Sequence, residues 1–384
     1  MAQSLHVQLA EDLAPQQRAG LAEVVALFQR MLDDGLHPGA QLAVFQHGRS
    51  LLEVAGGRSF AGGAPVTPRT LFQMRSITKL LATLVTLRSL ERGHFQLDDP
   101  VARYWPEFGA NGKAGITVRQ VMAHRAGIPD GPPLAPPQLH DRDLVRAAIE
   151  ALQPVWVPGT ENGYHAHTIG WVLQELVRVW EGQPLEVLLR REILEPLGID
   201  DLYLGLPESE FPRMAKMTVE DVVRAGTPRR AAMSDFINSY DGVRLPLSSV
   251  MGVATAPALA RLMSMVALGG AAHGQRIVAT ATLALAAVPT NAAGYRDLRL
   301  DHPIRWGLGF IVGNTPDIYG TPSRPRRIGH AGGGANVAWA DPDSGVAVAF
   351  LSNRMLAREA SWARCRIVSD AVDAALGGGA DLSN

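Results

Sequence analysis

The sequence predicts an α/β protein in which one part is built from both ends of the chain and is interrupted by a mostly helical segment. The chain opens with an amphipathic helix over residues 15–36 and a strand over residues 41–53. It closes with two strand-like runs over residues 328–341 and 345–353 and an amphipathic helix over residues 358–376. The length of 384 residues suits two domains, or one large domain with an insertion.

The first third of the chain alternates between helical and extended patterns. The opening strand ends in Gly56-Gly57, which predicts a turn. A strong helix is expected over residues 76–92 and a short one over residues 117–124, because glycine or proline follows each of them. Four prolines in residues 131–138 predict a surface loop.

The middle of the chain is mostly helical in pattern. The segments with helical periodicity are residues 169–180, 184–197, 256–269 and 278–288. The sheet is therefore expected to draw its strands from the two ends of the chain.

Composition limits the possible partners. The chain has 36 basic and 37 acidic residues, a formal charge of −1, so a nucleic-acid partner is not expected. The single cysteine, Cys365, cannot form an internal disulfide. The longest stretch without charge, residues 277–295, is interrupted by polar residues and proline, so no membrane span is expected. The first residues lack a basic, then apolar, leader pattern, and a cytoplasmic location is expected.

The most informative local motif is Ser76-Ile77-Thr78-Lys79, where a strand-like run meets the start of a helix. A serine hydroxyl is a weak nucleophile and needs a base, and residues three apart on a helix share a face. Burial and a helix N-terminus both favour the neutral amine of Lys79, which can accept a proton. With 17 serines and three lysines, about 0.13 such matches are expected by chance. The alternative is a capping serine followed by a surface lysine.

Two further motifs could complete such a site. Tyr164, just before a helix, could relay the serine proton, although a buried tyrosine alone can be a simple core residue. In the segment 329–334, glycines next to His330 could let a substrate lie against a strand and could leave a backbone N–H free for an oxyanion. Alone, these glycines fit a bulge or turn equally well, and His330 could be a site residue or a surface one.

Other chemistries lack a motif. His165 and His167 have the spacing of strand neighbours, but no cysteine or acidic cluster accompanies them, so no metal site is predicted. The sequence contains no Gly-x-Ser-x-Gly elbow, no Walker loop and no dinucleotide-binding glycine pattern after a strand. We therefore expect no metal and no organic cofactor.

Together, Ser76-x-x-Lys79, Tyr164 and the His330-x-Gly332 strand occur in the order found in the serine β-lactamase and penicillin-binding superfamily. Within it the chain most resembles the class C β-lactamase-like carboxylesterases, called family VIII esterases. The resemblance covers most of the chain. It extends to residues 71–79, 104–108, 124–129, 156–160 and 306–309.

The resemblance implies a β-lactamase/transpeptidase-like α+β fold, with an antiparallel sheet flanked by helices and a mostly helical domain. We place the sheet domain in residues 1–75 and 300–384, and the helical domain in residues 76–299, with the active site at the junction.

The resemblance also implies roles for individual residues. Ser76 matches the acylated nucleophile, Lys79 its base partner and Tyr164 the proton shuttle. Gly333 matches the residue whose N–H completes the oxyanion hole, and His330 and Gly332 match the substrate-binding strand.

Two departures from the β-lactamase pattern suggest a substrate class. Tyr164-His165-Ala166 replaces Tyr-x-Asn, which removes an amide side chain, and His330-Ala331-Gly332 replaces Lys-Thr-Gly. Histidine is mostly neutral at pH 7, so a fixed cation for a substrate carboxylate is missing at that position. Both losses favour neutral small-molecule esters over carboxylated amides. Short acyl chains are expected only because they are common in the family that the chain resembles.

Three functional hypotheses follow. The first is an ester hydrolase that works through an acyl-enzyme. The second uses the same machinery as a β-lactamase, a D-amino-acid peptidase or an acyltransferase. The third is a non-catalytic binding protein of the same fold. The oligomeric state cannot be predicted from these patterns.

Overall fold

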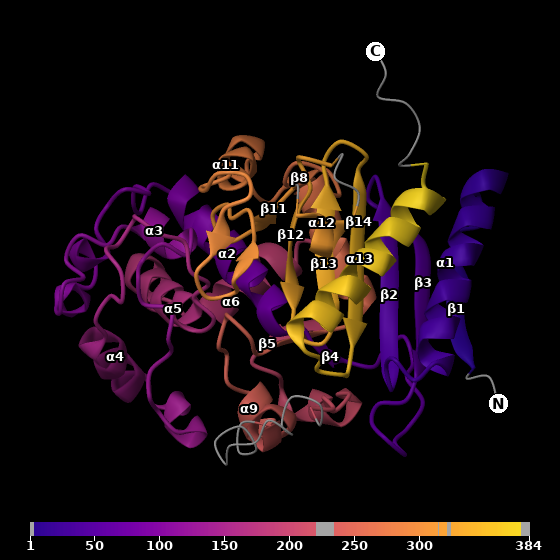
Figure 1. Cartoon of the computed structure of the whole chain (residues 1–384), viewed down its shortest axis with the longest axis horizontal. Coiled ribbons are helices and arrows are strands. Elements are labelled where there is room, and N and C mark those ends of the chain that lie inside the picture. Colours follow the sequence, from indigo (N-terminus) through magenta and orange to yellow (C-terminus); the bar gives the residue numbers. More distant parts are fainter. Residues whose placement is uncertain (1–3, 220–233, 314, 321–323, 378–384) are drawn as a thin grey trace.

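A computed structural model of the chain describes residues 4–219, 234–313, 315–320 and 324–377. Its largest element is a seven-stranded antiparallel sheet in the order β1-β3-β2-β14-β13-β12-β11 (Figure 1). The strands are β1 (Leu5–Leu9), β2 (Gly39–Gln46), β3 (Arg49–Gly57), β11 (Ile311–Val312), β12 (Ile328–Gly332), β13 (Asn336–Asp341) and β14 (Val346–Ser352). The two ends of the chain meet where β2 pairs with β14, from Val346 opposite Gln46 to Ser352 opposite Ala40.

Helices cover both faces of this sheet, because its central strands carry apolar residues on both faces. On β14 the alternating side chains divide between two cores, with Ala347 and Ala349 in one and Val348 and Phe350 in the other. The alanine face packs against α10 (Ala256–Ala267), and the opposite face packs under α1 (Pro15–Asp33) and α13 (Arg358–Ala375). The antiparallel sheet flanked by helices is thus confirmed.

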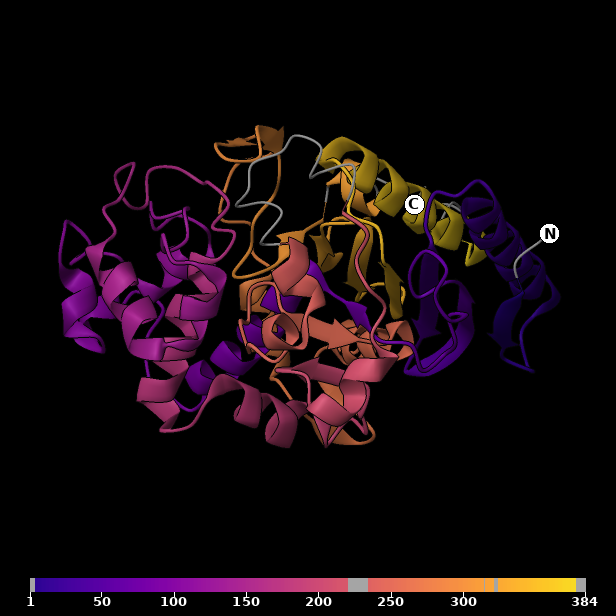
Figure 2. The same ribbon diagram turned by 90° about the horizontal axis from the view of Figure 1, so that it is seen from below.

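The helical part of the molecule lies at the opposite end from α1 in both views (Figures 1 and 2). Its longer helices are α2 (Lys79–Glu91), α4 (Arg142–Ala151) and α5 (Thr168–Glu181), and its shorter ones include α3 (Val118–Met122), α6 (Leu185–Leu189) and α11 (Thr280–Ala286). Helix α2 is buried along nearly its whole length and contacts both α5 and α6. Helix α10 also belongs to the middle of the chain, yet it packs on the sheet.

Two of the predicted strands are in fact hairpins. The run over residues 41–53 turns at His47 and Gly48, which both have positive φ, as the tightest antiparallel turns require. The run over residues 328–341 turns after Gly332, with Gly334 and Ala335 also in the left-handed region. Strand β1 was not predicted, because its side chains are largely exposed.

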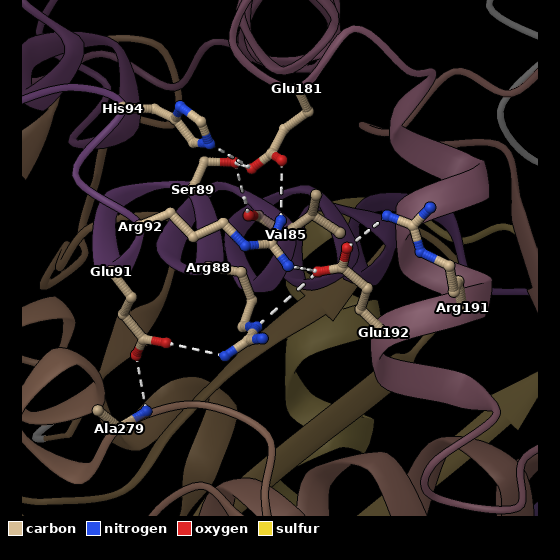
Figure 3. A network of polar contacts seen from close by, with 10 residues as sticks. All are labelled: Val85, Arg88, Ser89, Glu91, Arg92, His94, Glu181, Arg191, Glu192 and Ala279. Atoms are coloured by element: carbon tan, nitrogen blue, oxygen red, sulfur yellow. Dashed lines mark hydrogen bonds and ion pairs between the residues drawn. The ribbon is translucent and has the colours of Figure 1, made fainter.

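An ion-pair network fixes the end of α2 to its neighbours (Figure 3). Arg92 bonds Glu181 of α5 at 2.8 Å and also reaches Glu192 at 2.5 Å. The Ser89 hydroxyl donates to the same Glu181 at 2.7 Å. This network anchors the C-terminal end of the helix whose first residue is Lys79.

Within the described part of the chain, no helix combines the length and the apolar character that crossing a bilayer requires.

Candidate active site

Ser76 lies at a sharp turn between a short strand and α2. Strand β4 (Phe72–Gln73) pairs with β6 (Gly252–Ala254), and the chain then enters the 3-10 helix η1 (Arg75–Thr78). Arg75 has φ +53°, a conformation that is rare for a residue with a side chain and that concentrates at functional sites. Ser76 is half-buried, so its hydroxyl is not sealed inside the core. The predicted strand-to-helix junction is confirmed, with a 3-10 turn inserted.

Lys79 is a buried amine held by two carbonyl groups. Its side chain is 1% exposed, and Nζ donates to the carbonyl oxygens of Ala166 at 2.9 Å and Ser249 at 3.0 Å. Burial, followed by the positive charge of Arg75, lowers the pKa of Lys79 well below its usual value. A neutral amine has two N–H donors and one lone pair, so the two carbonyls occupy both donors and leave the lone pair available.

Tyr164 lies against this amine. Nζ of Lys79 is 4.8 Å from the centre of the Tyr164 ring. Burial and the nearby carboxylate of Asp297 raise the pKa of Tyr164, which keeps the phenol protonated. The Ser76 side chain is near enough to oppose this rise, although no hydrogen bond of ordinary geometry reaches the Tyr164 hydroxyl from the described residues. Likewise, no hydrogen bond between described side chains joins Ser76 to Lys79.

A single carboxylate fixes both the backbone and the ring of Tyr164. Asp297 is fully buried and accepts a hydrogen bond from the Tyr164 N–H at 3.0 Å. Its other oxygen accepts from Trp306 Nε1 at 2.9 Å, and the Trp306 ring stacks on Tyr164 at 5.5 Å with an interplanar angle of 5°. Sequence reasoning missed Asp297, because an isolated aspartate carries no motif, and used Trp306 only as part of the family resemblance.

The glycines after His330 bring strand β12 against the Ser76 turn. A Cβ atom on Gly332 would lie 2.4 Å from the carbonyl oxygen of Met74, so only glycine permits this approach. Gly333 lies in the following turn, is exposed, and has open space where a Cβ would be. The N–H groups of Ser76 and Gly333 donate to no acceptor among the described residues. Both are therefore available to an oxyanion.

His330 is buried beside Tyr164 rather than exposed. Its ring centre is 6.1 Å from that of Tyr164, and burial, the largest cause, lowers the pKa of His330 to about 3. Nδ1 lies 2.6 Å from the carbonyl oxygen of Ala331, so it carries the proton and donates. Nε2 then has a lone pair with no partner in the described part of the chain. His330 is thus neutral and supplies no cation.

Two more histidines, His124 and His165, lie next to Tyr164, and burial lowers the pKa of both. The sequence analysis did not place them in the site. The His124 ring lies 5.1 Å from that of Tyr164, and its Nδ1 accepts from the His165 N–H at 3.1 Å. His165 accepts from the Ile128 N–H through Nε2 and contacts the Gly163 carbonyl oxygen through Nδ1. Both His165 nitrogens are therefore used within the protein.

Comparisons with known proteins point to one family. The family model described as Beta-lactamase matches residues 24–366. The chain is 31% identical over 358 residues to the esterase/beta-lactamase LipL of Mycobacterium tuberculosis, covering 87% of this chain and 81% of LipL. It is 27% identical to the esterase EstB of Burkholderia gladioli, covering 86% of this chain and 90% of EstB. The crystal structure of a family VIII carboxylesterase superposes with a TM-score of 0.82 at 27% identity, covering 96% of this chain and 100% of that one.

Proposed function

The chain belongs to the beta-lactamase family, and we propose that within it the protein is a serine carboxylesterase that works through an acyl-enzyme on Ser76. The names of LipL and EstB, and the similar family VIII carboxylesterase structure, support ester hydrolysis. The observation that carries the mechanism is the buried Lys79 amine, whose Nζ donates to two carbonyl oxygens and whose pKa burial lowers well below its usual value.

In the acylation step, the Ser76 oxygen attacks the ester carbonyl carbon. The hydroxyl proton passes to the free lone pair of Lys79, directly or through Tyr164, and a tetrahedral oxyanion forms. When the intermediate collapses, the bond to the alcohol breaks. The Tyr164 hydroxyl gives a proton to the departing oxygen and regains one from the Lys79 ammonium. The products are the free alcohol and an ester on Ser76.

The N–H groups of Ser76 and Gly333 stabilise the negative oxygen in this step. Both are without an acceptor among the described residues, and donors placed where charge develops are usually the largest contribution to such catalysis. Gly332 and His330 form the strand beside which the substrate lies. In the second step, water attacks the carbonyl carbon of the acyl-enzyme, and its proton passes to Lys79, directly or through Tyr164. The bond to the Ser76 oxygen then breaks, that oxygen takes the proton back, and the carboxylic acid is released.

The site favours esters over lactams for two physical reasons. Ala166, at the position of the β-lactamase asparagine, offers no side-chain amide, and its carbonyl oxygen is occupied by Lys79. His330 is neutral, so it cannot hold a carboxylate as the lysine of Lys-Thr-Gly would. Short acyl esters are the expected substrates. β-lactamase activity is the second candidate, supported by the similarity to LipL, which is named an esterase/beta-lactamase.

The test compares Ser76→Ala with the wild-type protein on p-nitrophenyl butyrate, and Ser50→Ala serves as a control outside the site. We expect Ser76→Ala to lose at least about a thousandfold in kcat, and Ser50→Ala to keep the wild-type rate. Wild-type turnover by Ser76→Ala would refute the proposal. Nitrocefin, measured in parallel, ranks the lactam activity against the ester activity.

A further inference from the structure

Arg75, the residue directly before Ser76, is a charged group that the proposed mechanism does not use. It holds φ +53°, where glycine would be less strained, yet the position carries a long cationic side chain. Its Cβ lies 3.3 Å from the point that a Cβ on Gly332 would occupy, so its side chain starts beside the substrate strand. The Arg75 side chain therefore begins between the proposed nucleophile and strand β12.

The guanidinium of Arg75 has no carboxylate partner in the described part of the chain. Among the described residues, Nη1 of Arg75 donates a hydrogen bond to Oε1 of Gln73 at 3.4 Å. Burial lowers the pKa of Arg75 to about 10, which still leaves it charged at neutral pH. Arg75 is half-buried, and cations that are shielded from water are usually paired with a carboxylate, so this one is unusual.

The ionisable groups around Arg75 do not neutralise it. Lys79 and Tyr164 are close enough to interact with its charge, and burial favours the uncharged form of both. His167 also senses Arg75, and burial lowers the pKa of His167 to about 4, so it is neutral as well. Within residues 4–219, 234–313, 315–320 and 324–377, a positive charge without a counter-charge thus lies next to the proposed nucleophile.

We propose that Arg75 binds a carboxylate of the substrate, so that the enzyme prefers esters that carry a negative charge close to the scissile bond. The inference rests on the proposed function and refines its substrate class, because the neutrality of His330 alone would suggest neutral esters. A guanidinium is well suited to this task, since its planar donors match the two oxygens of a carboxylate. In this proposal the cation that binds the substrate carboxylate lies in the turn before Ser76 and not on strand β12.

A matched pair of substrates isolates this effect. In one pair, 4-acetoxybenzoate is compared with 4-acetoxybenzamide, which places the charge on the leaving alcohol. In the other, mono-p-nitrophenyl adipate is compared with p-nitrophenyl 6-oxoheptanoate, which places the charge on the acyl side. The ratio of kcat/KM within each pair cancels any general effect of Arg75 on Lys79, because both members use the same base.

We expect the wild-type protein to prefer the anionic member of at least one pair by about ten- to a hundredfold, as a charge-assisted hydrogen bond implies. Arg75→Gln should abolish this preference, Arg75→Lys should keep part of it, and the exposed-site control Arg103→Gln should keep all of it. Should Arg75→Gln not fold, inhibition of the wild-type protein by 4-hydroxybenzoate against 4-hydroxybenzamide gives an independent measure, with tighter binding expected for the acid.

Two outcomes overturn the inference. One is a wild-type protein that shows no anionic preference in either pair and no tighter binding of the acid. The other is a preference that Arg75→Gln retains in full. Neither outcome touches the proposed function, which fails only if Ser76→Ala still hydrolyses the neutral esters at the wild-type rate.

Discussion

Nζ of Lys79 lies 4.8 Å from the centre of the Tyr164 ring, and the two side chains reach this position from distant parts of the chain. Lys79 begins α2, whereas Tyr164 precedes α5 and is anchored by Asp297. Burial acts on the two groups in opposite senses, since it lowers the pKa of the amine and raises that of the phenol. Burial thus favours the uncharged form of both groups, in which the amine can accept a proton and the phenol can donate one.

Replacing Lys79 by arginine should remove the base while keeping a long side chain that ends in N–H donors. Arginine is not deprotonated in proteins, so it cannot accept the Ser76 proton. We expect kcat for p-nitrophenyl butyrate to fall by about 10²- to 10⁴-fold. Lys216→Arg, at an exposed lysine, is the control and should keep full activity. A Lys79→Arg protein with wild-type kcat would show that the base lies elsewhere.

The acid side of the pH profile should report the protonation of Lys79. Because its pKa is lowered, the active neutral amine persists until the pH falls through that lowered pKa. Arg75→Gln removes a neighbouring positive charge and so raises the pKa of Lys79. The acidic limb of kcat/KM for a neutral ester should therefore move to higher pH. If the acidic limb of the kcat/KM profile of Arg75→Gln lay at the same pH as that of the wild-type protein, Arg75 would not influence the pKa of Lys79.

Asp297 should act on activity through Tyr164. Asp297→Ala leaves the N–H of Tyr164 and Nε1 of Trp306 without their acceptor, and we expect a loss of at least about 2 kcal/mol in the free energy of unfolding. At a temperature where the variant is still folded, kcat should fall while KM changes little, because the displaced phenol serves proton transfer. Tyr164→Phe should lower kcat without the same loss of stability. Full activity in folded Asp297→Ala would exclude this positioning role.

The adjacent glycines Gly332 and Gly333 provide a contrasting pair. A Cβ on Gly332 would meet the Met74 carbonyl oxygen at 2.4 Å and would push β12 away from the Ser76 turn, whereas a Cβ on Gly333 would meet open space. Gly332→Ala should therefore lower both the melting temperature and kcat/KM, and Gly333→Ala should melt like the wild-type protein. Thermal unfolding of both variants checks the difference, and equal melting temperatures would contradict the close packing.

The second buried lysine should behave differently from Lys79. Nζ of Lys113 donates to the carbonyl oxygens of Ala110 and Glu150, each at 2.8 Å, and also to that of Leu152. It thereby satisfies carbonyl groups at the end of α4, far from Ser76 in the sequence. Lys113→Met should reduce the melting temperature and leave kcat of the folded protein unchanged. A selective loss of kcat would instead connect this lysine to the site.

Features that depend on a few neighbouring residues could be predicted from the sequence. The Ser76 and Lys79 pair could be proposed because one helical turn fixes their separation, and most helices could be placed from periodicity and from the glycines that end them. The hairpin at His47-Gly48 was predicted as one strand. This pair is not a typical turn sequence, and the extended residues on both sides of it share the same apolar pattern.

The rest of the candidate site depends on contacts between distant segments. Nothing near Asp297 in the sequence shows that its carboxylate would bind Tyr164, and Ser249 contributes only its backbone carbonyl, which any residue type could supply. The lack of a carboxylate beside Arg75 among the described residues likewise becomes visible only when its neighbours are known. Such features follow from the tertiary packing of α2, α5 and β12.

The most direct test of the acyl-enzyme is to trap it. The protein is quenched with acid during turnover of p-nitrophenyl butyrate, digested and mapped by peptide mass spectrometry. We predict a butyryl adduct on the peptide that contains Ser76 in the wild-type protein, and its absence in Ser76→Ala. Turnover with the adduct on another residue, or rapid turnover by Ser76→Ala, would contradict the account.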